Sequence, residues 1–209
     1  MNFHRRNVFV TFCFGVTWVV AVAVGWRFVL NYDSAAGAVG TVPQKWPAHS
    51  AIHRASDRMT LVMLAHPRCP CTRATMGELA RIMASAQGKV NAYVLFFRPK
   101  NSKPDWDNTD LRRSAAAIPG VTAISDVEGV EAHLFGAETS GHTLLFGRDG
   151  SLLFSGGITD SRGHAGGNKG ESAIVALVNN QRPALNRTMV FGCRIADQMK
   201  TMKDAICSK

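Results

Sequence analysis

The sequence of 209 residues lacks most of the short motifs that identify common enzyme and nucleic-acid-binding classes. It has no Gly-x-Ser-x-Gly elbow and no pair of carboxylates at catalytic separation, so hydrolase functions have little support. The glycine-rich run 162–170 lacks the Gly-Lys-Ser/Thr of a phosphate-binding loop. The net charge of +9 is spread along the chain without a block of Lys or Arg, which argues against a nucleic-acid partner.

Charged residues are also absent from a long stretch near the N-terminus, residues 8–26. At about 1.5 Å per residue this stretch is long enough to cross a hydrocarbon core of about 30 Å. Arg5 and Arg6 precede it, which favours a cytoplasmic N-terminus. We therefore predict a single-pass anchor over residues 1–32 in the inner (cell) membrane, with the remaining chain in the periplasm or another extracytoplasmic space. A signal peptide cleaved near residues 34–36 is the alternative.

Cysteine is scarce, with five residues in the whole chain. Cys13 lies within the predicted anchor and is interpreted as a small apolar residue. The other four, Cys69, Cys71, Cys193 and Cys207, would lie where disulfides can form and persist. For the last two, two possibilities stay open: a structural disulfide between them, or an approach of Cys193 to Cys69 as a third thiol.

The chain after the anchor divides into three parts. Residues 33–56, rich in Ala, Gly, Pro and Ser, predict a linker, residues 57–182 a domain, and residues 183–209 a C-terminal extension. Within the domain, buried-strand and helical patterns alternate. The expected strands are 60–65, 90–97, 121–125, 142–146 and 151–157, and the expected helices are 72–86, 111–117, 127–135 and 171–180. Asp149-Gly150 predicts a hairpin between the last two strands. This order predicts an α/β sheet with helices on both faces.

The segment Cys69-Pro70-Cys71 falls between the first strand and the first helix. A helix N-terminus presents unpaired N–H groups and a partial positive charge, which stabilise a cysteine as thiolate. Arg68 and His66 are close enough in sequence to lower the thiol pKa further. A disulfide closed by so short a loop would be strained and easily reduced. Thiol chemistry is therefore expected here, and a soft metal such as Cu(I) is the alternative use of the same thiols.

The strand–cysteine–helix junction and the segment SGHTLLFGRDGSLLFSGGIT together resemble the thioredoxin fold, and in particular membrane-tethered TlpA-like and RedB-like thioredoxin-related proteins. The resemblance implies a thioredoxin-like three-layer α/β/α sandwich with a mixed sheet. It also implies thiol–disulfide exchange with a protein thiol or disulfide partner, without a cofactor. In this comparison Cys69 is the nucleophile and Cys71 the resolving thiol.

Two departures from the family pattern affect the expected site. The family carries Cys-x-x-Cys, one residue longer than the segment found here. It also has a cis-proline before the strand that faces the cysteines, and His142 is expected at that place. We therefore predict a catalytic set of Cys69, Cys71, His142 and Arg68. A copper-binding or copper-delivering protein with Cys69, Cys71 and His142 as ligands, and a thiol peroxidase, are the alternatives.

Overall fold

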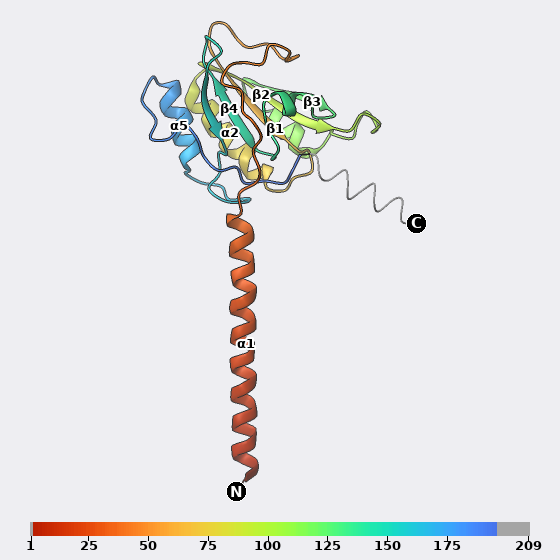
Figure 1. Ribbon diagram of the computed structural model, residues 1–209, viewed down its shortest axis with the longest axis vertical. Coiled ribbons are helices and arrows are strands. Elements are labelled where there is room, and N and C mark those ends of the chain that lie inside the picture. The colour runs from red at the N-terminus through yellow and green to blue at the C-terminus, as the bar shows by residue number, and fades with distance from the viewer. Residues whose placement is uncertain (1, 196–209) are drawn as a thin grey trace. The chain divides into compact units, whose positions relative to one another are not determined.

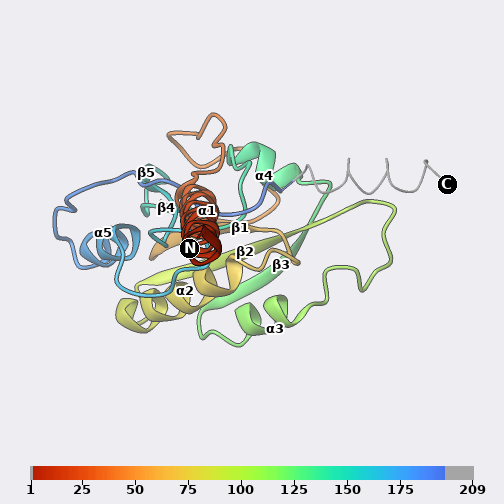
Figure 2. The same cartoon turned by 90° about the horizontal axis from the view of Figure 1, so that it is seen from below.

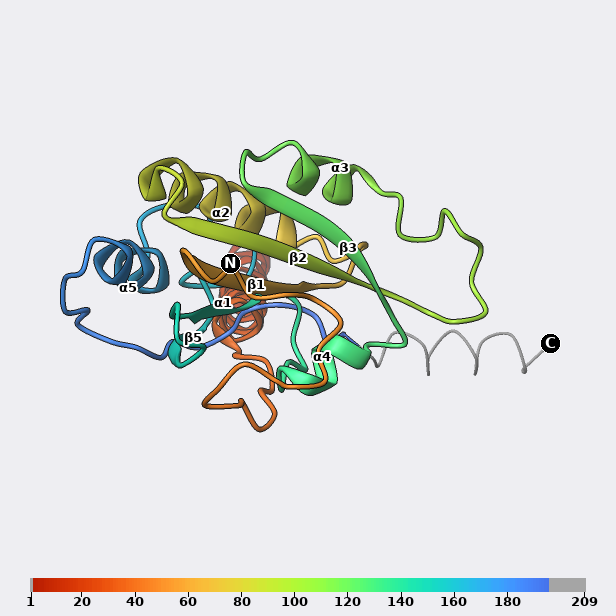
Figure 3. The ribbon, with the colours of Figure 1, turned by 90° about the horizontal axis from the view of Figure 1, so that it is seen from above.

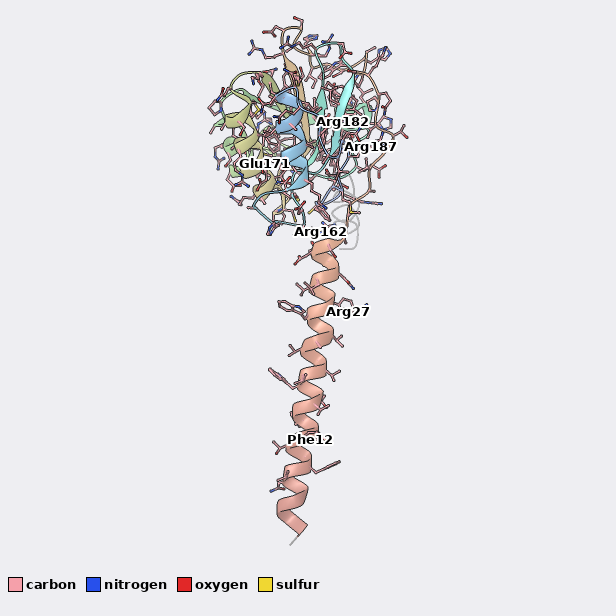
Figure 4. The ribbon with its side chains drawn as sticks, turned by 90° about the vertical axis from the view of Figure 1, so that its left-hand side faces the viewer. Phe12, Arg27, Arg162, Glu171, Arg182 and Arg187 are labelled. Carbon is pink, nitrogen blue, oxygen red and sulfur yellow. The ribbon has the colours of Figure 1, made fainter. Side chains whose placement is uncertain are left out.

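The computed structural model describes residues 2–195, and the chain forms two compact units divided after Ala35. The first unit is one helix, α1 (Asn2–Ser34). Within it, Asn7–Ser34 has a mean hydropathy of 2.3 and is long and apolar enough to cross a membrane. Its large apolar side chains are exposed, and Figure 4 shows Phe12 and Arg27 pointing outward from the helix. Cys207 lies outside the described residues.

The second unit contains a mixed sheet of five strands in the order β3-β2-β1-β4-β5 (Figure 1). β1 pairs in parallel with β2, and β2 with β3, whereas β4 is antiparallel to both β1 and β5. The strands are β1 (Met59–Ala65), β2 (Val90–Arg98), β3 (Val121–Val127), β4 (His142–Phe146) and β5 (Leu152–Gly156). The predicted parallel crossovers followed by a hairpin are confirmed.

Four helices connect the strands of the domain. They are α2 (Thr72–Ala86), α3 (Asp110–Ala116), α4 (Val130–Leu134) and α5 (Lys169–Val178). The helix expected over 127–135 is shorter than predicted, because β3 continues through Val127. The carboxylate of Asp126 then accepts hydrogen bonds from the backbone N–H groups of Glu131 and Ala132, at 2.9 Å each. This capping fixes the start of α4.

Each face of the sheet is covered by its own apolar cluster. On one face, residues of α2, α3 and α5, such as Leu79, Leu111 and Ile174, pack against the sheet. On the other face, Phe135 and Ile52 pack against strand residues such as Leu144. Figures 2 and 3 show α2 and α3 on one side of the sheet and α4 on the other. The thioredoxin-like three-layer arrangement with a mixed sheet is thus confirmed, although the second outer layer contains one short helix and irregular segments.

The segment that we expected to be a linker packs on the domain instead. The Trp46 N–H donates to the carbonyl of Gly150 at 2.8 Å, and the Leu152 N–H donates to that of Gln44 at 2.9 Å. The Trp46 ring contacts Phe135 and Phe146 edge-on, with centroids 5.2 and 5.1 Å away. Residues 36–56 therefore belong to the same compact unit as the sheet.

Candidate functional site: a three-thiol cluster at the start of α2

The chain leaves β1 at Ala65 and is already turning as a helix before α2 begins at Thr72. The Cys69 N–H donates to the carbonyl of His66 at 3.1 Å, and the Thr72 N–H donates to that of Cys69 at 3.2 Å. Pro70 fits this turn because its fixed φ suits the start of a helix, where its missing N–H is not needed. Cys69 therefore lies at the N-terminal end of α2, as predicted, and Cys71 is the N-cap residue.

Three cysteines meet at this junction. The sulfur atoms of Cys69, Cys71 and Cys193 all lie within 4.8 Å of one another. The shortest contact joins Cys69 Sγ and Cys193 Sγ, at 3.1 Å. Cys69 and Cys71 are buried and Cys193 is partly buried, and all three are free thiols. Of the two possibilities that the sequence left open for Cys193, the structure therefore shows the approach to Cys69.

The chain around Cys193 is fixed by contacts with two other segments. The Ser140 N–H donates to the carbonyl of Cys193 at 2.8 Å, and Arg162 Nη1 donates to the carbonyl of Gly192 at 2.5 Å. Gly192 lies so close to Ser140 that a Cβ at this position would overlap the Ser140 carbonyl oxygen. Arg162, which Figure 4 labels, comes from the loop after β5.

The three thiols differ in their affinity for a proton. Burial raises the pKa of Cys69, but hydrogen bonds from Thr72 and Cys193 outweigh it and hold that pKa below its ordinary value. Burial, together with the hydrogen bond to Cys69 and the Cys69 charge, raises the pKa of Cys193 to about 12. Burial and the Cys69 charge also raise the pKa of Cys71, against a smaller opposing effect of Arg162. Of the three sulfurs, Cys69 therefore loses its proton most readily, and Cys71 and Cys193 hold theirs more firmly.

A chain of hydroxyl groups supports the Cys69 thiolate. The His66 N–H donates to Ser140 Oγ at 2.8 Å, and Ser140 Oγ lies 2.7 Å from Thr72 Oγ1. Because Ser140 Oγ already accepts from His66, its own proton is available to Thr72, whose hydroxyl can then donate to Cys69. Sequence reasoning missed Ser140 and Thr72. Thr72 directly follows Cys71 in the sequence, whereas Ser140 lies 68 residues further on, and no local pattern links Ser140 to the cysteines.

Arg68 and His66, which we expected to lower the thiol pKa, contact an aromatic cluster. The Arg68 guanidinium lies over the Trp106 ring, 4.7 Å from its centroid. The His66 ring lies edge-on to Trp106 at 5.7 Å, and its Nδ1 accepts a hydrogen bond from the Arg68 N–H at 3.2 Å. Burial, and to a lesser degree Arg68, lowers the pKa of His66 to about 4, so His66 is neutral near pH 7. A catalytic role for Arg68 stays a prediction.

His142 is the first residue of β4, and its side chain is buried. Its Nε2 lies 2.8 Å from Ser155 Oγ, and burial lowers its pKa to about 4. Side chains alternate along a strand, so His142 shares the face of Leu144, whereas Thr143 shares the face covered by α2. The group of thiols within 4.8 Å contains Cys193 and does not include His142. The residue of this segment that contacts the cysteine junction is Ser140.

No family model and no curated protein matches the sequence, but solved structures do. A hypothetical protein from Sinorhizobium meliloti is 16% identical, with 78% of this chain and 96% of that chain covered and a TM-score of 0.57. An uncharacterized conserved protein from Geobacillus kaustophilus is 19% identical, with 78% and 92% covered and a TM-score of 0.56. A secreted disulfide oxidoreductase of Mycobacterium tuberculosis is 16% identical, with 58% and 82% covered and a TM-score of 0.42. At such identities the first two similarities describe the fold alone.

Replacing Thr72 by Val should raise the pKa of Cys69, because it removes a hydroxyl donor without a large change of shape. A hydrogen bond worth about 1 kcal/mol corresponds to somewhat less than one pKa unit, so alkylation of Cys69 near pH 7 should slow by about fivefold. The measurement is the pH dependence of iodoacetamide modification at Cys69, read by mass spectrometry. Thr72→Ser keeps the hydroxyl and should retain the original profile. Identical profiles for Thr72→Val and the unmodified chain would contradict the assigned hydrogen bond.

Proposed function

We propose that the chain is a membrane-anchored thiol–disulfide oxidoreductase that acts on a protein partner outside the cytoplasm, with Cys69 as its nucleophile. The observation that carries this proposal is a buried cysteine at the start of α2, with a lowered pKa and two further thiols within 4.8 Å. A thiolate is the reactive form of cysteine, and a neighbouring thiol is needed to release the partner. Both requirements are met at the same junction.

The proposed reaction moves two electrons between the partner and the cluster. The Cys69 thiolate attacks one sulfur of a partner disulfide, which forms a mixed disulfide and releases the other partner sulfur as a thiolate. A second thiol of the cluster then attacks Cys69 Sγ, forms an internal disulfide and releases the partner as a dithiol. The resemblance to thioredoxins assigns this second step to Cys71. The reverse sequence oxidises a partner dithiol.

Replacing Cys69 by Ser should lower the reduction of glutathione disulfide or insulin, with dithiothreitol as electron donor, by at least about 100-fold, because the attacking thiolate is lost. The measurement is turnover by the full chain in detergent. Cys13→Ser is the matched control, since Cys13 lies in α1, and it should retain full turnover. Turnover that survives Cys69→Ser would remove the basis of the proposal. Fast consumption of hydrogen peroxide with slow consumption of disulfides would instead indicate the thiol peroxidase.

The membrane topology is the second part of the proposal. The length and hydropathy of Asn7–Ser34 and the two arginines before it support a retained anchor with a cytoplasmic N-terminus. Alkaline phosphatase joined after residue 209 should be active in cells, and a fluorescent protein that folds only in the cytoplasm should be dark at the same place. The intact mass of the purified protein should include residues 1–34. The opposite reporter pattern, or a mass that begins near residue 36, would reject the retained anchor.

Copper delivery is a second candidate, favoured by the closeness of the three sulfurs. A metal–thiolate bond of about 2.3 Å in a trigonal arrangement separates the sulfurs by about 4 Å, which is compatible with a group of sulfurs within 4.8 Å. Thiolates are also the ligands that select Cu(I). The residues present therefore fit a soft cation, with Cys193 in the place that we expected for His142. Loading would require Cys71 and Cys193 to lose their protons.

Competition with a Cu(I) chelator separates the two functions. A copper carrier should hold one equivalent of Cu(I) tightly in the reduced full chain and lose it in Cys193→Ser, because the three-sulfur set is then incomplete. Cys13→Ser should bind as the unmodified chain does. Absence of a tight stoichiometric site in the reduced chain would reject copper delivery and leave the oxidoreductase.

A further inference from the structure

The C-terminal segment that carries Cys193 is placed against the nucleophile more directly than the second cysteine of the Cys-Pro-Cys motif. We infer that Cys193, and not Cys71, is the thiol that resolves mixed disulfides on Cys69, so that the oxidised site is a Cys69–Cys193 disulfide. This inference rests on the proposed oxidoreductase function and names the second thiol of that reaction. It differs from the assignment that the thioredoxin resemblance implies.

The sulfur atoms of Cys69 and Cys193 are already close to the separation at which a disulfide can form. Their sulfurs are 3.1 Å apart, and a disulfide bond is about 2.05 Å long. Bond formation therefore requires an approach of about 1 Å, which rotation of two side chains can supply. The two cysteines come from separate segments, so the approach does not require either backbone to unwind.

Cys71 is less suited to the same step because it follows Cys69 within one turn. The backbone from His66 to Arg73 makes successive i to i+3 hydrogen bonds, from Cys69 to His66, Thr72 to Cys69 and Arg73 to Pro70. Side chains two apart in such a turn leave the backbone in different directions, although the Cys69 and Cys71 sulfurs still lie within 4.8 Å of each other. A Cys69–Cys71 disulfide would bring their Cβ atoms to about 3.8 Å, and the turn that begins α2 would have to open.

Close backbone contacts at three glycines fix the position of the segment that carries Cys193. Gly156 and Gly157, at the end of β5, lie so close to Thr188 and Met189 that a Cβ on either glycine would overlap the passing backbone. Further along, Gly192 has the same relation to Ser140. These close approaches exclude larger residues and hold the segment 188–193 against the sheet edge. Cys193 therefore reaches the cluster as a consequence of backbone packing.

The resolving step balances without an additional reactant. Cys193 begins as a thiol with its sulfur 3.1 Å from Cys69 Sγ, and its hydrogen bond stabilises the thiolate form of Cys69. After Cys69 has formed a mixed disulfide with a partner sulfur, the Cys193 sulfur bonds to Cys69 Sγ, and the bond between Cys69 and the partner breaks. The Cys193 proton passes to the departing partner thiolate. Over both steps the partner disulfide gains two electrons from Cys69 and Cys193 and one proton from Cys193, and the partner thiolate released in the first step takes any further proton from water.

Disulfide mapping of the unmodified full chain tests this inference directly. The reduced protein in detergent is mixed with glutathione disulfide, quenched with N-ethylmaleimide and digested for mass spectrometry. We expect a peptide pair joined through Cys69 and Cys193, with Cys71 alkylated. A pair joined through Cys69 and Cys71, or a Cys193–Cys207 pair with Cys69 still glutathionylated, would overturn it. Because this arm needs no variant, it does not depend on how substitutions fold.

A second experiment measures, in a single turnover, how fast two matched variants resolve the mixed disulfide on Cys69. In Cys193→Ser the mixed disulfide on Cys69 should accumulate and resolve at least about tenfold more slowly, because the positioned thiol is gone. In Cys71→Ser the mixed disulfide should resolve at least about tenfold faster than in Cys193→Ser, because Cys193 is still in place. The opposite ranking would assign resolution to Cys71 while leaving Cys69 as nucleophile, and the proposed function would stand. Absence of glutathionylation at Cys69 in every chain would instead reject the proposed function itself.

Two glycine variants test whether the position of Cys193, and not only the presence of its thiol, determines the rate of resolution. Gly192→Ala keeps every thiol but forces the segment away from the Ser140 carbonyl, so resolution should again slow by about tenfold. Gly167→Ala is the control, since a Cβ at Gly167 has no neighbour within 4 Å, and it should behave as the unmodified chain does. Equal resolution rates in Gly192→Ala and Gly167→Ala would contradict a role that depends on the docking of this segment.

Discussion

The close approach of the segment 188–193 to the sheet edge is the constraint on which the candidate site depends. Gly156, Gly157 and Gly192 permit it, because any side chain at these positions would overlap a neighbouring backbone. The hydrogen bond from Ser140 to the carbonyl of Cys193 completes the docking. Without this contact the Cys-Pro-Cys junction would keep two cysteines two residues apart, and Cys69 would lose both the donor and the thiol that Cys193 supplies. The site is therefore a tertiary assembly and not a local motif.

Three thiols in one buried cluster cannot all ionise, since each charge raises the pKa of the others and burial penalises every thiolate. The surrounding hydrogen bonds decide which sulfur carries the charge. Cys69 receives donors from Thr72 and Cys193, and the Thr72 hydroxyl is itself oriented by Ser140. A single favoured thiolate gives the exchange a defined first step. The same arrangement limits metal binding, because a trigonal thiolate site must first displace two firmly held protons.

Much of the fold could be predicted from the sequence because its signals are local. Short apolar runs such as residues 60–65 mark buried strands, and Asp149-Gly150 marks the hairpin. The junction of Cys69 with α2 is equally local. The place of Cys193 is not, since 124 residues separate it from Cys69 and no period relates them. The backbone hydrogen bonds that join the Trp46 segment to Gly150 and Leu152 are likewise tertiary contacts that leave no trace in composition. A role of His142 in the site stays a prediction, and alternation along β4 places its side chain on the face of Leu144.

The first residues of the domain are hydrogen-bonded to the C-terminal segment that also carries Cys193 to the site. The Gly37 N–H, two residues beyond the unit that contains α1, donates to the carbonyl of Val190 at 2.8 Å. Three residues later, Cys193 contacts Cys69. A disulfide at that point would close a loop of more than a hundred residues, and such long loops gain most from cross-linking in the chain-entropy description. Oxidation would thus stabilise the docking of both terminal segments, and reduction would leave them held by hydrogen bonds and close packing. If the proposed Cys69–Cys193 disulfide forms, the thermal stability of the domain should therefore be higher in the oxidised than in the reduced protein.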